Sequence, residues 1–106
     1  METIHKIGRR KTAVARVYLS EGKGNITVNN KEYDKYFTTD TLKYKVLQPL
    51  SLTENLEAFD IKVKVLGGGI TGQAEAIRLG ISRALVALDE ENRAILKPEG
   101  LLTRDP

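Results

Sequence analysis

Apolar and charged residues alternate along residues 59–65, which is the clearest pattern in the chain. The odd positions are apolar and the even positions are charged: Phe59, Ile61, Val63 and Val65 against Asp60, Lys62 and Lys64. Because the side chains of a strand point alternately to opposite faces, this pattern predicts a strand with one buried face and one face open to solvent or a ligand.

A second strand is predicted over residues 12–19, where β-branched and aromatic residues are frequent and one face is apolar: Ala13, Ala15, Val17 and Leu19. The glycine-containing segment 22–25 then favours a turn, and residues 26–28 (Ile-Thr-Val) favour a short returning strand. Residues 12–28 are therefore predicted to form a β-hairpin.

Helical periodicity extends over residues 70–88, where apolar residues recur at helical spacing: Ile70, Ala74, Ile77, Ile81, Leu85 and Leu88. This segment is the main predicted helix. A second row, on an adjoining side, contains small residues: Gly72, Ala76, Gly80 and Ala87. Because Gly80 weakens a helix by about 1 kcal/mol relative to alanine, this small-residue row indicates a close neighbour on that side.

Two shorter helices complete the predicted order. One begins near Asp40, as a candidate N-cap, and ends at Gln48 before Pro49; the other covers residues 90–96, with Asp89 as its cap. No linker or repeat divides the chain, so residues 1–106 are expected to form a single domain. The order strand, strand, helix, strand, helix, helix predicts an α+β fold, with helices packed on one face of a small mixed sheet.

Composition narrows the function classes. The chain has 17 lysine and arginine residues against 14 acidic ones, and the basic excess falls in residues 1–50, which favours a polyanionic partner. The absence of cysteine excludes disulfides and thiolate chemistry, and His5 is the only histidine, so no metal site is expected. Neither a signal peptide nor an apolar run of bilayer length is present. A cytoplasmic protein without cofactor or membrane contact is therefore expected.

The segment 67–72, Gly-Gly-Gly-Ile-Thr-Gly, matches the G-x-G-x-x-G pattern of dinucleotide-binding proteins. That site also needs a buried parallel strand before the loop and an acidic residue at the end of a second strand, and neither is predicted here. The phosphate-binding pattern of NTPases is incomplete too, because Gln73 and Ala74 replace its lysine and hydroxyl residue. Two interpretations remain open: the glycines permit a tight turn, or their N–H groups bind an RNA phosphate.

Four cations lie close together in the run 6–12, Lys-Ile-Gly-Arg-Arg-Lys-Thr, just before the predicted strand. Arginine pairs with phosphate through two parallel hydrogen bonds, and a flexible glycine lets the backbone follow a sugar-phosphate chain. Arg16 would extend this patch along its strand, and Lys62 and Lys64 would continue it if their strand lies alongside. Nucleic-acid binding is therefore favoured over a merely solvated surface.

Three segments resemble, in the correct order, motifs of the ribosomal S-nine family: GRRKTAVARV (residues 8–17), GGGITGQAEAIRLGISRAL (residues 67–85) and GLLTRDP (residues 100–106). The resemblance covers essentially the whole chain. It implies a fold like the second domain of ribosomal protein S-five, with a left-handed crossover. It also implies a protein without catalytic activity that binds ribosomal RNA in the head of the small subunit, beside other head proteins.

Carried over by motif, the resemblance implies RNA contacts by Arg9, Arg10, Lys11, Arg16, Gly68, Gly69, Gln73, Arg78, Arg83 and Arg104. Members of the family continue beyond the Asp-Pro position into a basic tail that reaches transfer RNA, whereas this chain ends at Pro106. The resemblance therefore implies a missing tail and no transfer RNA contact by the residues present. Two other classes are the alternatives: a nucleotide-dependent enzyme, and an interaction module that self-associates through the small-residue row.

Overall fold

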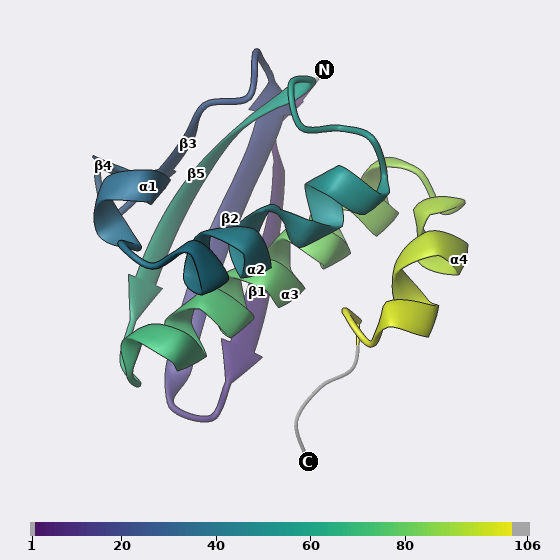
Figure 1. Cartoon of the computed structure of the whole chain (residues 1–106). Coiled ribbons are helices and arrows are strands. Elements are labelled where there is room, and N and C mark those ends of the chain that lie inside the picture. The colour runs from purple at the N-terminus through teal and green to yellow at the C-terminus, as the bar shows by residue number, and fades with distance from the viewer. Residues whose placement is uncertain (1, 103–106) are drawn as a thin grey trace.

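One mixed β-sheet organises the computed structural model, which describes residues 2–102 (Figure 1). Within that range the strand order is β1-β2-β5-β3-β4, with these bounds: β1 (Ile4–Arg10), β2 (Ala13–Glu21), β3 (Ile26–Val28), β4 (Lys31–Glu32) and β5 (Phe59–Leu66). The helices are α1 (Tyr33–Tyr36), α2 (Asp40–Leu52), α3 (Ile70–Leu88) and α4 (Asn92–Leu96), and a 3-10 turn follows at Lys97–Glu99.

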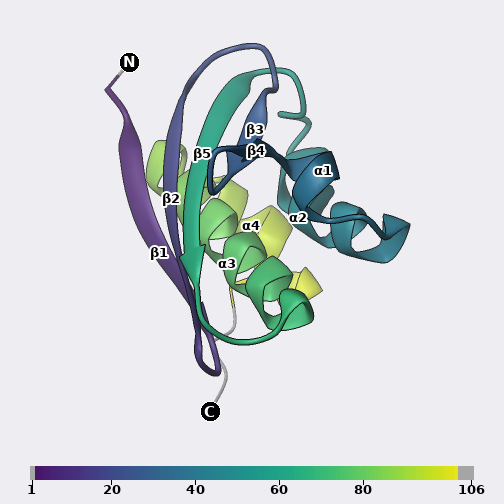
Figure 2. The ribbon, with the colours of Figure 1, turned by 90° about the vertical axis from the view of Figure 1, so that its left-hand side faces the viewer.

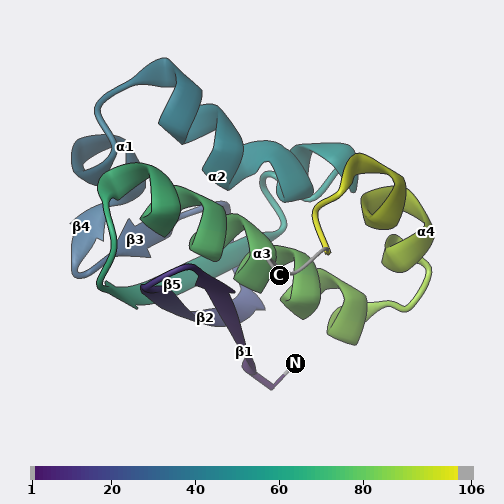
Figure 3. The same cartoon turned by 90° about the horizontal axis from the view of Figure 1, so that it is seen from below.

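Helices α2 and α3 lie on one face of this sheet, and no described helix covers the other face (Figures 2 and 3). The core between the layers is made of alternate strand residues and the inner sides of the helices, including Leu19, Ile61, Phe37, Ile77 and Leu85. The alternation in β5 is the one predicted, since Ile61, Val63 and Val65 are buried and Lys62 and Lys64 are exposed. The predicted α+β arrangement, with helices on one face, is therefore confirmed.

The connection between β3 and β5 is a crossover of unusual hand. These two strands are parallel neighbours, joined through α1 and α2 on the helical side of the sheet. In Figure 1 the helices face the viewer, β5 points downward and the β3 edge lies to its left, so the path from β3 to β5 turns in a left-handed sense. The crossover implied by the family resemblance is confirmed, although most parallel connections are right-handed.

The hairpin predicted for residues 12–28 is wrong. Strand β5 lies between β2 and β3, antiparallel to β2 and parallel to β3. The local partner of β2 is instead β1, which precedes it across a turn at Lys11 and Thr12. The sequence of β1 shows no alternation of apolar residues, so the strand was not predicted. Its one buried residue is Gly8, which packs against the backbone of α3.

The helix boundaries also differ from the predicted ones. Thr39, not Asp40, caps α2 by accepting a hydrogen bond from the Leu42 N–H, and the helix continues through Pro49 to Leu52. Pro49 has no N–H to donate to the Lys45 carbonyl, so α2 lacks one hydrogen bond there. Beyond the proline the Thr53 hydroxyl and N–H both donate to the Pro49 carbonyl oxygen at the end of the helix. Helix α4 begins at Asn92, and Asp89 accepts a hydrogen bond from the Glu91 N–H just before it.

Asp60 holds the loop that carries the chain from β2 over the end of β5 to β3. One of its carboxylate oxygens accepts hydrogen bonds from the N–H groups of Lys23 and Asn25, each at 3.0 Å. These bonds favour the ionised form, so the pKa of Asp60 lies below its ordinary value. The carboxylate therefore fixes a connection that the local sequence does not define.

Acidification is expected to weaken this loop. A lowered folded-state pKa means that the ionised Asp60 stabilises the protein above the unfolded pKa and that this contribution is lost as the pH falls through the folded one. Urea unfolding at a series of pH values should show wild type more stable than Asp60→Asn at pH 7, with the difference narrowing below about pH 4. A difference that is constant over that range would contradict this role of the carboxylate.

Candidate nucleic-acid interface

Four cations lie together on the helix-free face of the sheet. Ala13, Ala15, Val17 and Leu19 of β2 point into the core, so Arg16 points the other way, and its cross-strand partner Lys64 points with it. Lys62 lies two residues further along β5, and Arg9 of β1 pairs with Val14 on the same face. We call Arg9, Arg16, Lys62 and Lys64 the basic sheet face. Strands β2 and β5 lie side by side, so Lys62 and Lys64 continue the patch of Arg16, as the sequence predicted for this case.

The basic sheet face is exposed, and its side chains have no polar partner among the described residues. The four side chains form no hydrogen bond or ion pair with residues 2–102. Arg16 and Lys64 are directly opposite one another, and like charges at such a pair destabilise a sheet. A bound polyanion would relieve this repulsion. Lys11 adds an exposed cation at the adjoining turn, where its backbone has a positive φ of 55°.

Three other predicted arginines lie on the helical side of β1, and each has a protein partner. Arg10 forms an ion pair with Glu75 at 3.2 Å, and Arg78 donates to the Gln48 side chain at 3.2 Å. Arg83 donates to the backbone carbonyl of Ile7 in β1, at 2.8 Å. Arg10 and Arg78 line a cleft of about 230 Å³ together with Arg9 and Glu75, and the carboxylate of Glu75 makes this side less positive than the basic sheet face.

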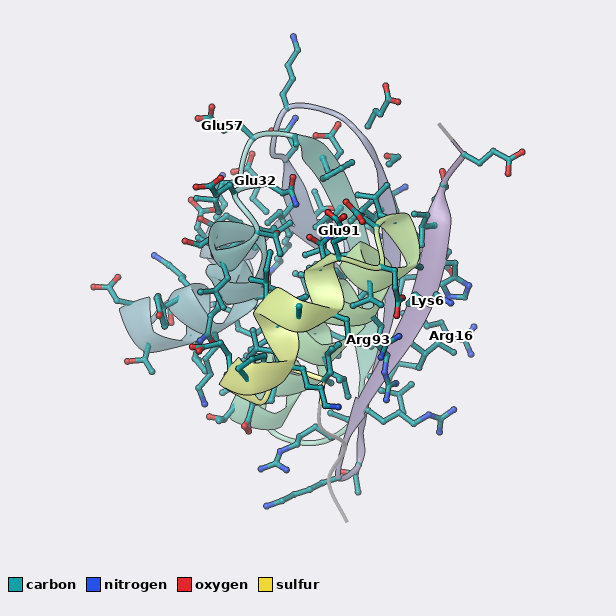
Figure 4. All side chains as sticks on the ribbon, turned by 90° about the vertical axis from the view of Figure 1, so that its right-hand side faces the viewer. Lys6, Arg16, Glu32, Glu57, Glu91 and Arg93 are labelled. Atoms are coloured by element: carbon teal, nitrogen blue, oxygen red, sulfur yellow. The ribbon has the colours of Figure 1, made fainter. Side chains whose placement is uncertain are left out.

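Figure 4 shows that β1 separates these two surfaces, since Arg16 points away from the helices whereas Arg93 lies between α4 and β1. Arg93 donates to Glu90 at 2.7 Å and lines a second cleft with Lys6 and Arg83. The structure therefore divides the predicted RNA-contacting residues into two sets. Arg16 belongs to the helix-free face, and Arg10, Arg78 and Arg83 belong to the helical side. Arg9 projects from the helix-free face and also borders the cleft of Arg10 and Arg78.

Two of the three consecutive glycines in the loop between β5 and α3 are required by the structure. Gly67 and Gly68 have positive φ values of 78° and 64°, and a side chain on either would meet the β1–β2 turn at Thr12 and Ala13. Gly69 has no such contact. Gln73 fastens the loop, since it donates to the Gly67 carbonyl and accepts from the Tyr36 hydroxyl. The tight-turn interpretation therefore explains Gly67 and Gly68, and phosphate binding by this loop stays a prediction.

Strand β1 of the same chain packs against the small-residue row on α3. The close neighbour is β1, whose Gly8 lies against the backbone of Ala76 and Gly80. Ala76 and Gly80 are buried, so they do not form a face for self-association. A dinucleotide site is not formed either, because α3 is followed in residues 89–102 by helical turns and not by the second parallel strand that such a site requires.

Two aromatic residues on the helix-free face were not singled out by the sequence patterns. The rings of His5 in β1 and Tyr18 in β2 stack with their centroids 4.4 Å apart and an angle of 5° between their planes. The alternation in residues 13–19 already places Tyr18 on the same face as Arg16, which is the signal that could have identified it. Arg104, the last predicted contact, lies outside the described residues.

The described part of the chain contains neither a membrane-spanning helix nor a cluster of metal ligands. In residues 2–102 no helix is long and apolar enough to cross a membrane. In the same range no group of three or more His, Cys, Asp or Glu residues could hold a metal ion.

Comparison with known proteins agrees with the three sequence motifs. The family model described as ribosomal protein S9/S16 matches residues 8–106. The small ribosomal subunit protein uS9 of Christiangramia forsetii is 76% identical over the whole chain, which covers 83% of that protein. The proteins of the same name from Flavobacterium psychrophilum and Parabacteroides distasonis are 66% and 52% identical over the same coverage. This chain belongs to the ribosomal protein S9/S16 family.

Proposed function

We propose that this chain is a structural component of the small ribosomal subunit, that it has no catalytic activity, and that it binds ribosomal RNA through its basic sheet face. The relatives reported above carry the name of a small-subunit protein. One observation supports this choice of surface: four exposed cations that form no ion pair within residues 2–102 lie on the face of the sheet that no described helix covers. The site would act in the ribosome in the cytoplasm, beside other proteins of the subunit head.

The chemistry of the face suits a sugar-phosphate backbone. The guanidinium groups of Arg9 and Arg16 can each donate two parallel hydrogen bonds to one phosphate, whereas Lys62 and Lys64 act as point charges. Because β2 and β5 are neighbouring strands of one sheet, roughly 5 Å apart, these charges form a continuous strip that a phosphate chain can follow. Lys11 extends the strip beyond the end of the sheet.

The helical side of β1 supplies a weaker second contact in this proposal. Arg10, Arg78 and Arg83 have donors to spare beyond the bonds that they make within the protein, since each guanidinium carries five N–H groups. Their protein partners orient them, which lowers the entropic cost of meeting a phosphate. Gly68, Gly69 and Gln73 remain proposed contacts at the adjoining loop, and we assign no contact with transfer RNA to residues 2–102.

Removing three charges from the basic sheet face is expected to weaken RNA binding strongly. The variant Arg9→Ala, Arg16→Ala, Lys64→Ala would be compared with wild type in binding to RNA of the small-subunit head domain across a salt series. Each lost phosphate contact should flatten the slope of log K against log salt by roughly 0.7–0.9, so the triple variant should lose about two units of slope and bind at least about tenfold more weakly. Arg10 is left unchanged because its loss would also break the ion pair with Glu75.

The matched control removes the same charge from other surfaces: Lys31→Ala, Lys35→Ala, Lys97→Ala. These lysines are exposed on β4, on α1 and in the 3-10 turn. The control variant should keep most of the wild-type slope, because its change in net charge is equal but its lysines lie outside the proposed interface. Equal losses in both variants would mean that only net charge matters, and coincident curves for the sheet-face variant and wild type would refute the proposed surface.

A further inference from the structure

A pocket of about 450 Å³ opens on the helix-free face next to the basic sheet face. Its floor is β5, and its walls come from β2 and β3, because Tyr18 and Thr27 both lie opposite Lys62 in the strand registers. The residues that line it and bear on its chemistry are Tyr18, Ser20, Asn25, Thr27, Asp60 and Lys62. The pocket is thus continuous with the proposed phosphate strip at Lys62.

Tyr18 presents one aromatic face to this pocket. Its other face is covered by the parallel ring of His5, 4.4 Å away on β1. Since β1 lies on one side of β2 and β5 on the other, the uncovered face of Tyr18 is turned toward β5 and the pocket. A flat aromatic group entering the pocket could therefore stack on Tyr18, which His5 supports from behind.

The two ends of the pocket differ in charge. Asp60, which already accepts the N–H groups of Lys23 and Asn25, places a negative charge at one end and disfavours a phosphate there. The hydroxyl groups of Ser20 and Thr27 offer neutral hydrogen bonds. Phosphates are favoured at the other end, where Lys62 joins Lys64 and Arg16. The pocket therefore suits a neutral, flat, hydrogen-bonding group that is attached to a phosphate chain.

We propose that this pocket receives an unpaired base of the bound RNA, stacked on Tyr18, while the adjoining phosphates lie on the basic sheet face. The inference rests on the proposed RNA-binding function and specifies the form of RNA that the face recognises. Bases in an A-form helix are stacked and paired, so only a single-stranded loop, bulge or end can place a base on a protein ring. The face would then prefer single-stranded over double-stranded RNA.

The test measures binding of the full chain to a single-stranded RNA of about twelve nucleotides and to a duplex of the same length. Tyr18→Leu keeps an apolar side chain but removes the ring, whereas Tyr18→Phe keeps the ring. Tyr44→Leu is the matched control, since Tyr44 is 64% exposed on α2, away from this face. Tyr18→Leu should bind the single strand roughly tenfold more weakly than wild type, with little change for the duplex. Tyr18→Phe and Tyr44→Leu should bind as wild type does.

A second measurement does not depend on a variant. NMR chemical shifts of wild-type protein titrated with the single strand should move at Tyr18, Ser20 and Thr27, as well as at Arg16 and Lys64. Chemical shifts that change only at Arg16 and Lys64 would show that no base enters the pocket. The same conclusion follows if Tyr18→Leu binds the single strand as wild type does, and in both cases the proposed function still stands. Equal weakening of both RNAs by Tyr18→Leu would also overturn the pocket inference. If the Arg9, Arg16, Lys64 variant binds normally too, the proposed RNA surface itself fails.

Discussion

Replacing Gly8 by alanine is expected to destabilise the domain by at least about 3 kcal/mol, which is a large part of the stability of a small domain. A methyl group at this position would overlap the carbonyl oxygen of Ala76 and come within 2.5 Å of the Gly80 nitrogen. Both are backbone atoms of α3, so the clash is relieved only if the helix moves away from β1. Urea unfolding followed by circular dichroism measures the loss.

Gly69→Ala is the matched control for this prediction. A methyl group on Gly69 meets no atom within 4 Å, and its φ of −89° is accessible to alanine. Its effect on the free energy of unfolding should stay within about 0.5 kcal/mol. A Gly8→Ala variant as stable as Gly69→Ala would contradict the close packing of β1 on α3. That packing also bears on the proposed RNA binding, because it sets the position of the strand that carries Arg9 and Arg10.

Asn29→Ala is expected to cost about 3 kcal/mol, through two separate effects. The Asn29 side chain pairs with the backbone of buried Val65, accepting its N–H at 2.9 Å and donating to its carbonyl oxygen at 3.0 Å. Alanine would leave both backbone groups of Val65 without these partners, at roughly 1 kcal/mol each. Asn29 also has a positive φ of 49°, which alanine adopts at a further cost of about 1 kcal/mol.

Two variants separate these effects in thermal or urea unfolding. Asn29→Gly tolerates the positive φ and should show the loss of the side-chain bonds, about 2 kcal/mol. Asn30→Ala carries the backbone cost alone, since Asn30 has a φ of 69° and an exposed side chain that forms no hydrogen bond with residues 2–102. It should lose about 1 kcal/mol. If Asn29→Ala lost no more than Asn30→Ala, the bonds to Val65 would add no stability.

These contacts explain how the fold presents the proposed RNA-binding surface. The β1–α3 packing fixes one edge of the sheet, and the Asn29–Val65 pair ties β3 to the end of β5. Strands β2 and β5 between them are held at fixed spacing, so the opposed cations Arg16 and Lys64 are kept together despite their repulsion. An interface of this kind is preorganised, and little of the RNA-binding free energy is spent on ordering the protein.

Several features of this protein follow from short stretches of its sequence. The period of two in residues 59–65 predicts which side chains of β5 are buried, and the helical period of residues 70–88 predicts the bounds of α3. The three motifs identify the family, and with it the left-handed crossover. Each of these rests on local periodicity or on a contiguous motif, which a single segment carries by itself.

Other features depend on contacts between distant segments. The order β1-β2-β5-β3-β4 overrides the local hairpin pattern of residues 12–28. Strand β5, whose apolar residues Ile61, Val63 and Val65 are buried, has both of its backbone edges hydrogen-bonded only because β2 and β3 flank it. The same assembly pairs Arg10 with Glu75 and leaves Arg9 and Arg16 without a polar partner in residues 2–102. The sequence thus determined the family, the main elements and the set of candidate cations. The tertiary structure alone decided which cations share a face, because pairing between strands sets which side chains become neighbours.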